Sequence, residues 1–298
     1  MKFAFIARER TQRSSETVRL MCRWLGVSRS GFYASQVREP SKRSLLDQRL
    51  KLEIRAVHEK SRRRYGAPRV HAELKHQGES CGRNRVARIM RDEGLMGKKA
   101  KAFRVTTLSN HKKPVVANLL DRNFGIVDRE MNTAWVADIT YLSTREGWLY
   151  LATLIDLSSR RVVGWSIDSS LEEALTMRAL RMALITRKIR EGVEMLHHSD
   201  QGSQFVATDY QAVLGEHGIT QSMSRRSNCW DNAVAESFFA TLKTELVSDA
   251  KWESRSQAKR EVIEYLNWYN FNRRHSTLGY LTPAEHEMKM LQESSPAA

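Results

Sequence analysis

The chain has 298 residues, 41% of them hydrophobic, and carries 49 Lys and Arg against 34 Asp and Glu, a formal net charge of +15. It has no apolar run long enough to span a bilayer, and its first residues alternate apolar and basic types, so we expect a cytoplasmic protein with no membrane partner. The three cysteines, Cys22, Cys81 and Cys229, are scattered, which fits a reducing compartment and excludes a disulfide framework or a zinc motif.

The positive charge is concentrated in the first third of the chain. Residues 1–113 hold 29 Lys and Arg against 10 Asp and Glu, whereas the remaining 185 residues hold 20 against 24. A charge run is usually a solvated face, and for Arg62, Arg63 and Arg64 taken alone we favour that interpretation. A whole third with this excess favours electrostatic attraction to nucleic acid.

Two pairs of short helices are predicted in this basic third. The first pair consists of a helix over 16–25, a turn at Gly26 and a second helix capped by Ser28. The second pair consists of a helix from Pro68 to Leu74, a break at 78–80 and a helix over 83–93 that ends at Gly94. Helix-turn-helix DNA binding and two small helical bundles with basic surfaces both explain this pattern.

The helix at 83–93 carries the clearest candidates for DNA contact. Val86, Ile89 and Met90 form its apolar side. Four arginines lie mainly outside that side: Arg83, Arg85, Arg88 and Arg91. The segment that follows, up to about residue 118, is basic and without periodicity, and we interpret it as a linker that follows the DNA backbone.

From Thr133 the pattern changes to strands and helices. Three strands joined by tight turns are predicted at 133–143, 147–156 and 161–168, as an antiparallel meander. Further elements are expected in the order helix, strand, helix, strand, helix, helix at 171–189, 193–200, 208–216, 218–223, 228–247 and 256–272. Such an order predicts a mixed α/β sheet. We therefore expect a basic helical region at 1–96, a linker at 97–124 and a core with a helical extension at 125–290.

Three acidic residues in this core need an explanation. Asp138 lies in the middle of a strand of Trp, Val, Ile and Tyr, where an ionised carboxylate is costly unless it is paired or bound to a cation. Asp200 follows the strand at 193–199 and enters a glycine-containing turn. Glu236 lies on the helix at 228–247, for which Asp231 is a plausible N-cap.

The same helix separates apolar from polar side chains. One broad face holds five apolar residues: Val234, Ala235, Phe238, Leu242 and Leu246. Glu236 and Lys243 fall on the other side, about two turns apart. Taken alone, this pattern is typical of an ordinary amphipathic surface helix with a solvated polar face.

The spacing of the acids changes that interpretation. Thirty-five residues separate Asp200 from Glu236. Two acids at strand positions with a third on a later helix, at that final interval, resemble the D,D-35-E signature of insertion-sequence transposases related to retroviral integrases. Four blocks in order resemble second-reading-frame transposases of one large bacterial insertion-sequence family over about 118–283: WVADITYL, LHHSDQGSQF, DNAVAESFFATLKTE and YNFNRRHSTLGYLTP. The segments YGAPRVHAELKHQG and NRVARIMRDEGL resemble the helix-turn-helix region that precedes the core in this family, which favours DNA contact.

The resemblance implies a ribonuclease-H-like core and a metal-dependent enzyme. It implies that Asp138, Asp200 and Glu236 are the catalytic residues and the ligands of two Mg²⁺ or Mn²⁺ ions, and that Lys243 reaches the phosphate backbone. Two hard divalent cations can activate the attacking and leaving oxygens of a phosphodiester, and carboxylates hold such ions. The implied function is cleavage of DNA at the element's ends and transfer of the freed strand to a target.

Other residues in the core are given plainer roles. Asp156 and Asp168 end strands and Asp209 starts a helix, so turn and capping roles are favoured. His197 and His198 lack the partners of a zinc site, and no activating base surrounds Ser199 or Ser203 as a serine recombinase would require. On the helix at 256–272, Val262, Leu266 and Tyr269 have core spacing. Core packing is also favoured over DNA contact for four nearby residues: Trp268, Tyr269, Arg273 and His275.

Two alternatives and several partners remain open from the sequence. The alternatives are an inactive transposase core that only binds DNA, and a nuclease of the same fold. The resemblance implies DNA as the partner, a homo-oligomer on that DNA, and the first-reading-frame protein of the same element. We expect that protein to supply the separate helix-turn-helix and coiled coil that read the element's ends, with this chain acting as a fusion or together with it. Ser227 stands where the family commonly has Gly in the loop before the catalytic helix.

Overall fold

The computed structural model describes residues 2–10, 15–99, 115–125, 130–187, 189, 194–225 and 228–294. The chain forms two compact units, residues 1–55 and 56–298. Most of the predicted linker, at 100–114, and Ser227 lie outside the described residues. Within the described ranges, no helix combines the length and apolar character needed to cross a membrane.

The first unit is helical. It contains α1 (Lys2–Arg10), α2 (Ser15–Trp24), α3 (Arg29–Val37) and most of α4 (Lys42–Lys60). Ser28 caps α3 by accepting a hydrogen bond from the Gly31 backbone N–H at 2.9 Å, as predicted. The core of this unit is formed by Ile6, Val18, Met21, Cys22 and Phe32. The predicted pair α2 and α3 is confirmed, whereas α1 and α4 were not predicted.

The second predicted helix pair lies at the start of the second unit. It consists of α5 (Ala67–His76), with Pro68 in its first turn, and α6 (Arg83–Asp92), followed by Gly94 at a φ of +65°. Val86, Ile89 and Met90 are buried as expected. The interpretation of the preceding arginine run as solvated is wrong for Arg64. This side chain is 4% exposed, because its guanidinium stacks over two aromatic rings of α10 (Arg255–Phe271), at 5.0 Å from the Tyr265 centroid and 4.5 Å from that of Trp268.

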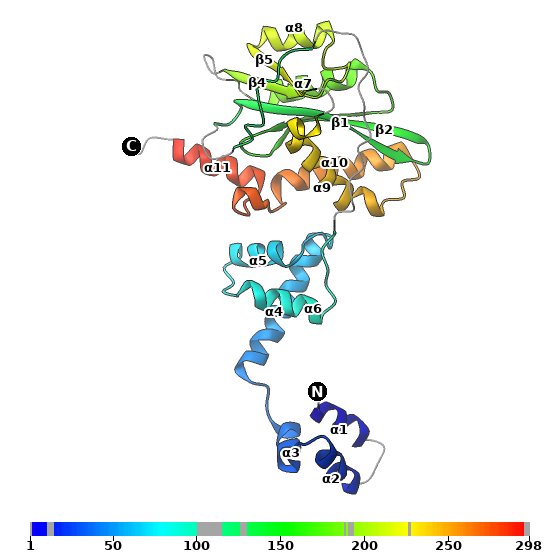
Figure 1. Ribbon diagram of the computed structural model, residues 1–298, viewed down its shortest axis with the longest axis vertical. Helices are drawn as coiled ribbons and strands as arrows, with labels where there is room; N and C mark the ends of the chain where they lie inside the picture. Colours follow the sequence, from blue (N-terminus) through cyan, green and yellow to red (C-terminus); the bar gives the residue numbers. More distant parts are fainter. Residues whose placement is uncertain are drawn as a thin grey trace. The chain divides into compact units, whose positions relative to one another are not determined.

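A five-stranded mixed sheet forms the centre of the second unit (Figure 1). Its strands are β1 (Ala134–Thr144), β2 (Gly147–Asp156), β3 (Val162–Asp168), β4 (Met195–Ser199) and β5 (Ile219–Met223). They lie in the order β3-β2-β1-β4-β5. The first three strands form the predicted antiparallel meander, whereas β4 and β5 run parallel to β1.

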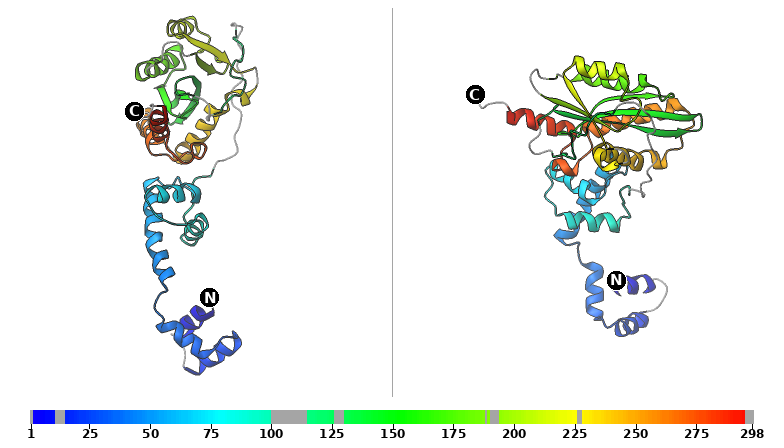
Figure 2. Two further views of the ribbon diagram at one scale, coloured as in Figure 1. Left: turned by 90° about the vertical axis from the view of Figure 1, so that its left-hand side faces the viewer. Right: turned by 45° about the horizontal axis from the view of Figure 1, so that its top comes forward.

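Helices cover both faces of this sheet (Figure 2). One face packs on α7 (Glu173–Thr186) and α8 (Thr208–Glu216), and the other packs on α9 (Ala233–Glu245) and α10. Gly164 on β3 lets α7 approach closely, because a Cβ there would lie 2.3 Å from the Ala179 carbonyl oxygen. The predicted ribonuclease-H-like mixed sheet is therefore confirmed. The C-terminal helix α11 (Pro283–Ser294) was not predicted.

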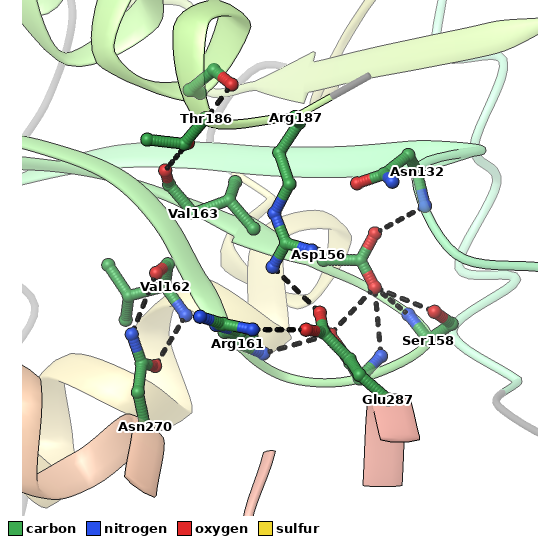
Figure 3. Close-up of polar contacts among 12 residues, drawn as sticks. Asn132, Asp156, Ser158, Arg161, Val162, Val163, Thr186, Arg187, Asn270 and Glu287 are labelled. Carbon is green, nitrogen blue, oxygen red and sulfur yellow. Dashed lines mark hydrogen bonds and ion pairs between the residues drawn. The ribbon is translucent and has the colours of Figure 1, made fainter. Parts of the chain in front are cut away.

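A buried polar cluster ties α11 to the turn between β2 and β3 (Figure 3). Asp156 is fully buried and accepts hydrogen bonds from the backbone N–H groups of Ser158 and Ser159 at 3.1 and 2.8 Å, which confirms its turn role. Glu287 of α11 is 4% exposed and accepts hydrogen bonds from Arg161 and Arg187. Because both carboxylates are fully engaged, this cluster supports the fold.

Candidate active site

The sheet register places two of the predicted acids side by side. Ala137 of β1 is the parallel partner of Ser199, the last residue of β4, so the residues that follow this pair are Asp138 on β1 and Asp200 directly after β4. Asp200 begins the turn after β4, where its Oδ1 accepts a hydrogen bond from the Gly202 backbone N–H at 3.0 Å. A Cβ at Gly202 would lie 3.0 Å from the same Oδ1, so this turn favours glycine.

Asp138 has an electrostatic environment that brings the third acid into the site. Burial raises the pKa of Asp138 well above its usual range, and the charges of Asp200 and Glu236 raise it further. The Ile139 backbone N–H, which donates to its Oδ1 at 2.7 Å, and the Lys243 ammonium act in the opposite direction. Asp200, Glu236 and Lys243 are therefore the charged residues that act on Asp138 near the point where β4 ends.

Helix α9 contributes Glu236 and Lys243 to this cluster. Its predicted apolar side is confirmed, since Ala235, Phe238 and Leu242 are buried, and Phe239 joins them. Glu236 and Lys243 are half-buried, so the polar side does not face open solvent. Burial raises the pKa of Glu236 as well. The polar side of α9 is therefore partly covered, and the charges of Glu236 and Lys243 both act on Asp138.

The start of α9 is held by contacts that differ from the predicted cap. Asp231 lies in a 3₁₀ turn before the helix, which begins at Ala233, so the N-cap prediction is wrong. Its fully buried carboxylate accepts hydrogen bonds from Arg122 and Arg225 at 2.8 Å each. The hydrogen bonds from Arg225 have the largest effect on the pKa of Asp231 and lower it, and those from Arg122 lower it further. Burial acts to raise this pKa, but the arginines hold it far below its usual range.

A neighbouring asparagine connects this turn to the strand of Asp138. The Asn232 side-chain amide donates to the Ala137 carbonyl oxygen at 3.3 Å, and Ala137 directly precedes Asp138. Sequence reasoning missed this contact, and the only available signal was the Asp-Asn pair in the block DNAVAES. The first turn of α9 is thereby fixed against β1.

The other end of α9 is anchored by a second buried carboxylate. Glu245 is 7% exposed and accepts two hydrogen bonds from the Arg273 Nε and one from the Tyr265 hydroxyl, all between 2.9 and 3.1 Å. Its backbone carbonyl accepts a hydrogen bond from the Arg64 Nε at 3.2 Å. Tyr269 and Arg273 are each 3% exposed, which confirms internal packing for them. The helix that carries Glu236 is thus held at both ends.

The donor set of the acid cluster suits a hard divalent cation. Carboxylate oxygens are the ligands that Mg²⁺ and Mn²⁺ prefer, and a cation would offset both the burial of the Asp138 carboxylate and its repulsion by Asp200 and Glu236, which together raise its pKa. Among the described residues, no three His, Cys, Asp or Glu side chains form a ready-made metal cage. An ion held by Asp138, Asp200 and Glu236 would therefore need water and substrate phosphate as further ligands.

The histidines beside Asp200 have structural roles. Burial lowers the pKa of His197 to about 3 and that of His198 to about 4, so both are neutral at physiological pH. His197 hydrogen-bonds the Tyr210 hydroxyl at 2.8 Å, and His198 lies 2.9 Å from the Ser222 hydroxyl. They support the strand that ends at Asp200.

The candidate DNA-contacting arginines of α6 differ in exposure. Arg83 and Arg91 are exposed, whereas Arg85 and Arg88 are half-buried. Arg88 forms an ion pair with Asp92 at 3.3 Å. Arg83 and Arg91 are therefore the more accessible of the four guanidinium groups on this helix.

Three known sequence families match parts of the chain. An integrase core domain family matches residues 128–229, a second integrase core domain family matches residues 217–283, and a helix-turn-helix-like domain family matches residues 45–103.

Individual proteins match nearly the whole chain. The "Insertion element IS600 uncharacterized 31 kDa protein" of Shigella sonnei is 43% identical over 273 residues, which cover 91% of this chain and 99% of that protein. The "Transposase InsF for insertion sequence IS3A" of Escherichia coli strain K12 is 40% identical over 294 residues, which cover 98% of this chain and all of that protein. Among solved structures, the HTLV-2 integrase catalytic core domain in complex with magnesium matches 53% of this chain and 97% of its own, with a TM-score of 0.41 and 16% identity.

Proposed function

The chain belongs to the IS3 family of insertion-sequence transposases, polynucleotidyl transferases with an integrase core domain, and on this premise we propose that Asp138, Asp200 and Glu236 are its catalytic acids. The observation that supports the proposal is the register of β1 and β4, which puts Asp138 beside Asp200; the pKa of Asp138, raised by burial and by the charges of Asp200 and Glu236, agrees with it. Burying like charges together is costly, and active sites are where such costs are concentrated.

The proposed reaction is a hydrolysis followed by a direct transesterification. In the first, water attacks the phosphodiester at an element end and the bond to the 3′ oxygen breaks, which frees a 3′-hydroxyl. In the second, that hydroxyl attacks a target phosphodiester, a new phosphodiester forms, and the target's own 3′ oxygen leaves. Both steps proceed without a covalent enzyme intermediate, so no serine nucleophile is needed.

The residues of the cluster divide this work. Asp138 and Asp200 present carboxylate oxygens from adjacent strands, and Glu236 presents a third carboxylate from α9. Two Mg²⁺ or Mn²⁺ ions held by these carboxylates would supply the activation of the attacking and leaving oxygens. Lys243, close enough to lower the pKa of Asp138, holds a backbone phosphate beside the acids as a compact positive charge.

The basic helical part of the chain supplies DNA affinity in this proposal. The arginines of α6 contact backbone phosphates: Arg83, Arg85, Arg88 and Arg91. DNA at the element ends and at the target is the substrate. A homo-oligomer on DNA, the first-reading-frame protein of the same element as partner, and a cytoplasmic site of action complete the proposal.

The test is strand joining by the full chain with pre-cut duplexes of its own element's ends and Mg²⁺. Asp138→Asn, Asp200→Asn and Glu236→Gln are each expected to abolish joining while DNA binding persists. Asp209→Asn is the matched control, because Asp209 is an exposed acid in the first turn of α8. Joining at nearly the wild-type rate by any triad variant removes that residue from the site.

The wild-type products separate the alternatives. When the ends are supplied intact instead of pre-cut, cleavage without joined products would identify a nuclease of the same fold. Metal-independent binding with neither cleavage nor joining would identify an inactive core that only binds DNA.

A further inference from the structure

Thr153 of β2 is the direct neighbour of Asp138 across the sheet. The two residues are partners in the antiparallel register of β1 and β2. Side chains of directly opposite residues point to the same face of a sheet, and their Cβ atoms are about 4.5–5.5 Å apart. The Thr153 hydroxyl and the Asp138 carboxylate therefore lie within reach of one another.

Both side chains lie on the sheet face that α9 and α10 cover. Two residues before Asp138, Val136 belongs to the apolar core on this face, and so do Leu151 and Ile155, which lie two residues to either side of Thr153. Because successive residues of a strand point to opposite faces, Asp138 and Thr153 point to this face as well. It is the face against which the helix that carries the third proposed acid is packed.

The Thr153 hydroxyl is buried without a hydrogen-bond partner. Thr153 is 1% exposed, and no residue in the described part of the chain forms a hydrogen bond with its Oγ1. A buried hydroxyl without a partner makes a fold less stable, whereas valine has the same shape and no polar atom. Packing alone would therefore favour valine at this position.

Asp138 is the acceptor among the sheet neighbours of Thr153. On the other side, the partner of Thr153 in β3 is Trp165, whose indole N–H can donate but not accept. Along β2, the neighbours of Thr153 on this face are apolar. Within the described residues, Asp138 accepts one hydrogen bond, from the Ile139 backbone N–H at 2.7 Å. An ionised carboxylate has about four acceptor positions, so it can also accept a hydrogen bond from Thr153.

A second unpaired polar atom adjoins the same point of β1. Asn232 is 4% exposed, and its amide donates to the carbonyl oxygen of Ala137, which precedes Asp138. Its Oδ1, however, accepts no hydrogen bond from the residues that the structure describes. Buried polar atoms without partners are rare in native proteins, and a catalytic role or a bound ion is among their explanations. Two such atoms next to Asp138 therefore point to a ligand site.

We propose that Thr153 is a positioning residue for the reaction: its hydroxyl donates a hydrogen bond to the Asp138 carboxylate and orients that carboxylate toward a divalent metal ion. The proposal rests on the function given above. Asp138 is half-buried whereas Thr153 is covered, so the hydroxyl approaches from the covered side and leaves the exposed part of the carboxylate to the ion. Rotation about χ1 moves a threonine hydroxyl between staggered positions, so this hydrogen bond needs no movement of the backbone.

The test is Mn²⁺ binding by the full chain without DNA, measured as the loss of the electron paramagnetic resonance signal of free Mn²⁺. The chain has many other acids, so the site is defined as the component of Mn²⁺ binding that Asp138→Asn removes. Loss of a hydrogen bond to a metal ligand typically weakens metal binding about 10–100-fold, and we expect this decrease for Thr153→Val. The same variant should unfold at an equal or higher temperature, because an unpaired buried hydroxyl is removed.

Further variants separate the hydroxyl from the shape of the side chain. Thr153→Ser should bind Mn²⁺ nearly as tightly as wild type, whereas Thr153→Ala should bind it as weakly as Thr153→Val. The Ser and Ala variants differ only in the hydroxyl, so they keep the test decisive if the Val variant does not fold. Thr176→Val is the matched control, since Thr176 is 1% exposed on α7, across the sheet, and donates to the Glu173 carbonyl oxygen at 2.9 Å. It should bind Mn²⁺ like wild type.

Joining with pre-cut ends gives a second readout. Because Thr153 acts through the affinity for the metal, Thr153→Val should join slowly at low Mn²⁺ concentration and recover toward the wild-type rate at saturating Mn²⁺. Asp138→Asn should stay inactive at every Mn²⁺ concentration, because a metal ligand itself is missing.

Two outcomes overturn the positioning role. One is Mn²⁺ binding by Thr153→Val as tight as that of wild type, and the other is equal binding by the Ser and Ala variants, which would assign any effect to packing. Mn²⁺ binding that Asp138→Asn leaves intact would overturn the metal role of Asp138, and with it this proposal. Failure of the proposed function and failure of the positioning role are therefore distinguishable.

Discussion

Replacement of Asp231 by asparagine tests whether the turn before α9 positions the catalytic helix. The Asp231 carboxylate is completely buried and accepts hydrogen bonds from Asn118 at 2.9 Å, from Arg122 at 2.8 Å and from both the backbone and the guanidinium of Arg225 between 2.8 and 3.0 Å. Asp231→Asn keeps the shape of the side chain but removes its charge and one acceptor oxygen.

The decrease in stability can be bounded from the exposure of the partners. Removing one member of a fully buried ion pair costs about 3–5 kcal/mol. Arg122 and Arg225 are 47% and 51% exposed, so both regain water when the charge disappears, and we expect a smaller cost of about 2–3 kcal/mol. For a unit of this size, that corresponds to a fall in Tm of roughly 4–12 °C.

The effect on joining should exceed what this decrease in stability explains. Asp231 is followed by Asn232, which is bound to β1 beside Asp138, and Glu236 lies one turn further along α9. A displacement of about 1 Å in a catalytic group can cost about 100-fold in rate, so joining well below the melting transition should fall by about one to two orders of magnitude.

A neighbouring acid provides the control. Asp121 lies 3.3 Å from the same Arg225 guanidinium, but its side chain is 75% exposed. Asp121→Asn should therefore change stability by no more than about 1 kcal/mol and leave joining intact. Thermal unfolding and joining with pre-cut ends, measured on both variants, decide the matter. Wild-type joining by Asp231→Asn would refute the positioning role.

Three further predictions concern other charged residues. Lys243→Ala should slow joining at limiting DNA concentration without altering the Tm, whereas an exposed lysine in a surface ion pair would show wild-type kinetics. Replacing the four α6 arginines by Gln should make the salt dependence of DNA binding shallower. In a plot of the logarithm of the binding constant against the logarithm of the salt concentration, the slope should fall by about one unit for each phosphate that is no longer neutralised. An unchanged slope would mean that the main DNA-binding surface lies elsewhere. Glu287→Gln should flatten the acid side of the stability profile. Burial acts to raise the Glu287 pKa, but hydrogen bonds and charges from Arg187 and Arg161 outweigh it and lower the pKa below 4.5. The wild-type contribution of Glu287 is therefore complete above pH 4.5 and disappears as the pH falls below that value, which thermal unfolding between pH 3 and 7 measures.

Local sequence pattern is sufficient to predict the order and type of the core elements from β1 to α10, but not the helix α11. Apolar strands and helices have different periods, so the meander, α8 and the apolar side of α9 follow from the pattern within each segment. The spacing of Asp138, Asp200 and Glu236 and the surrounding blocks indicate the family, because these signals lie within continuous segments. The helix pairs of the basic third are predictable from Ser28, Pro68 and Gly94, which act on the turns next to them.

Only the folded chain shows which charged residues are buried and with what partners. In the sequence, Arg64 resembles part of a solvated run, but its guanidinium stacks on the Tyr265 ring of α10 and donates a hydrogen bond to the Glu245 carbonyl at the end of α9. Asp231 resembles a helix cap, but its carboxylate accepts hydrogen bonds from Arg122 and Arg225. Glu245 and Arg273 are 28 residues apart in sequence. Local propensity contains no information about partners so distant, because burial of a charge is settled by the free energy of its final contacts and not by its neighbours in the chain. The pairing of β1 with β4 likewise joins segments that are distant in the sequence. Only its register shows that Asp138 and Asp200, 62 residues apart, lie next to each other where β4 ends.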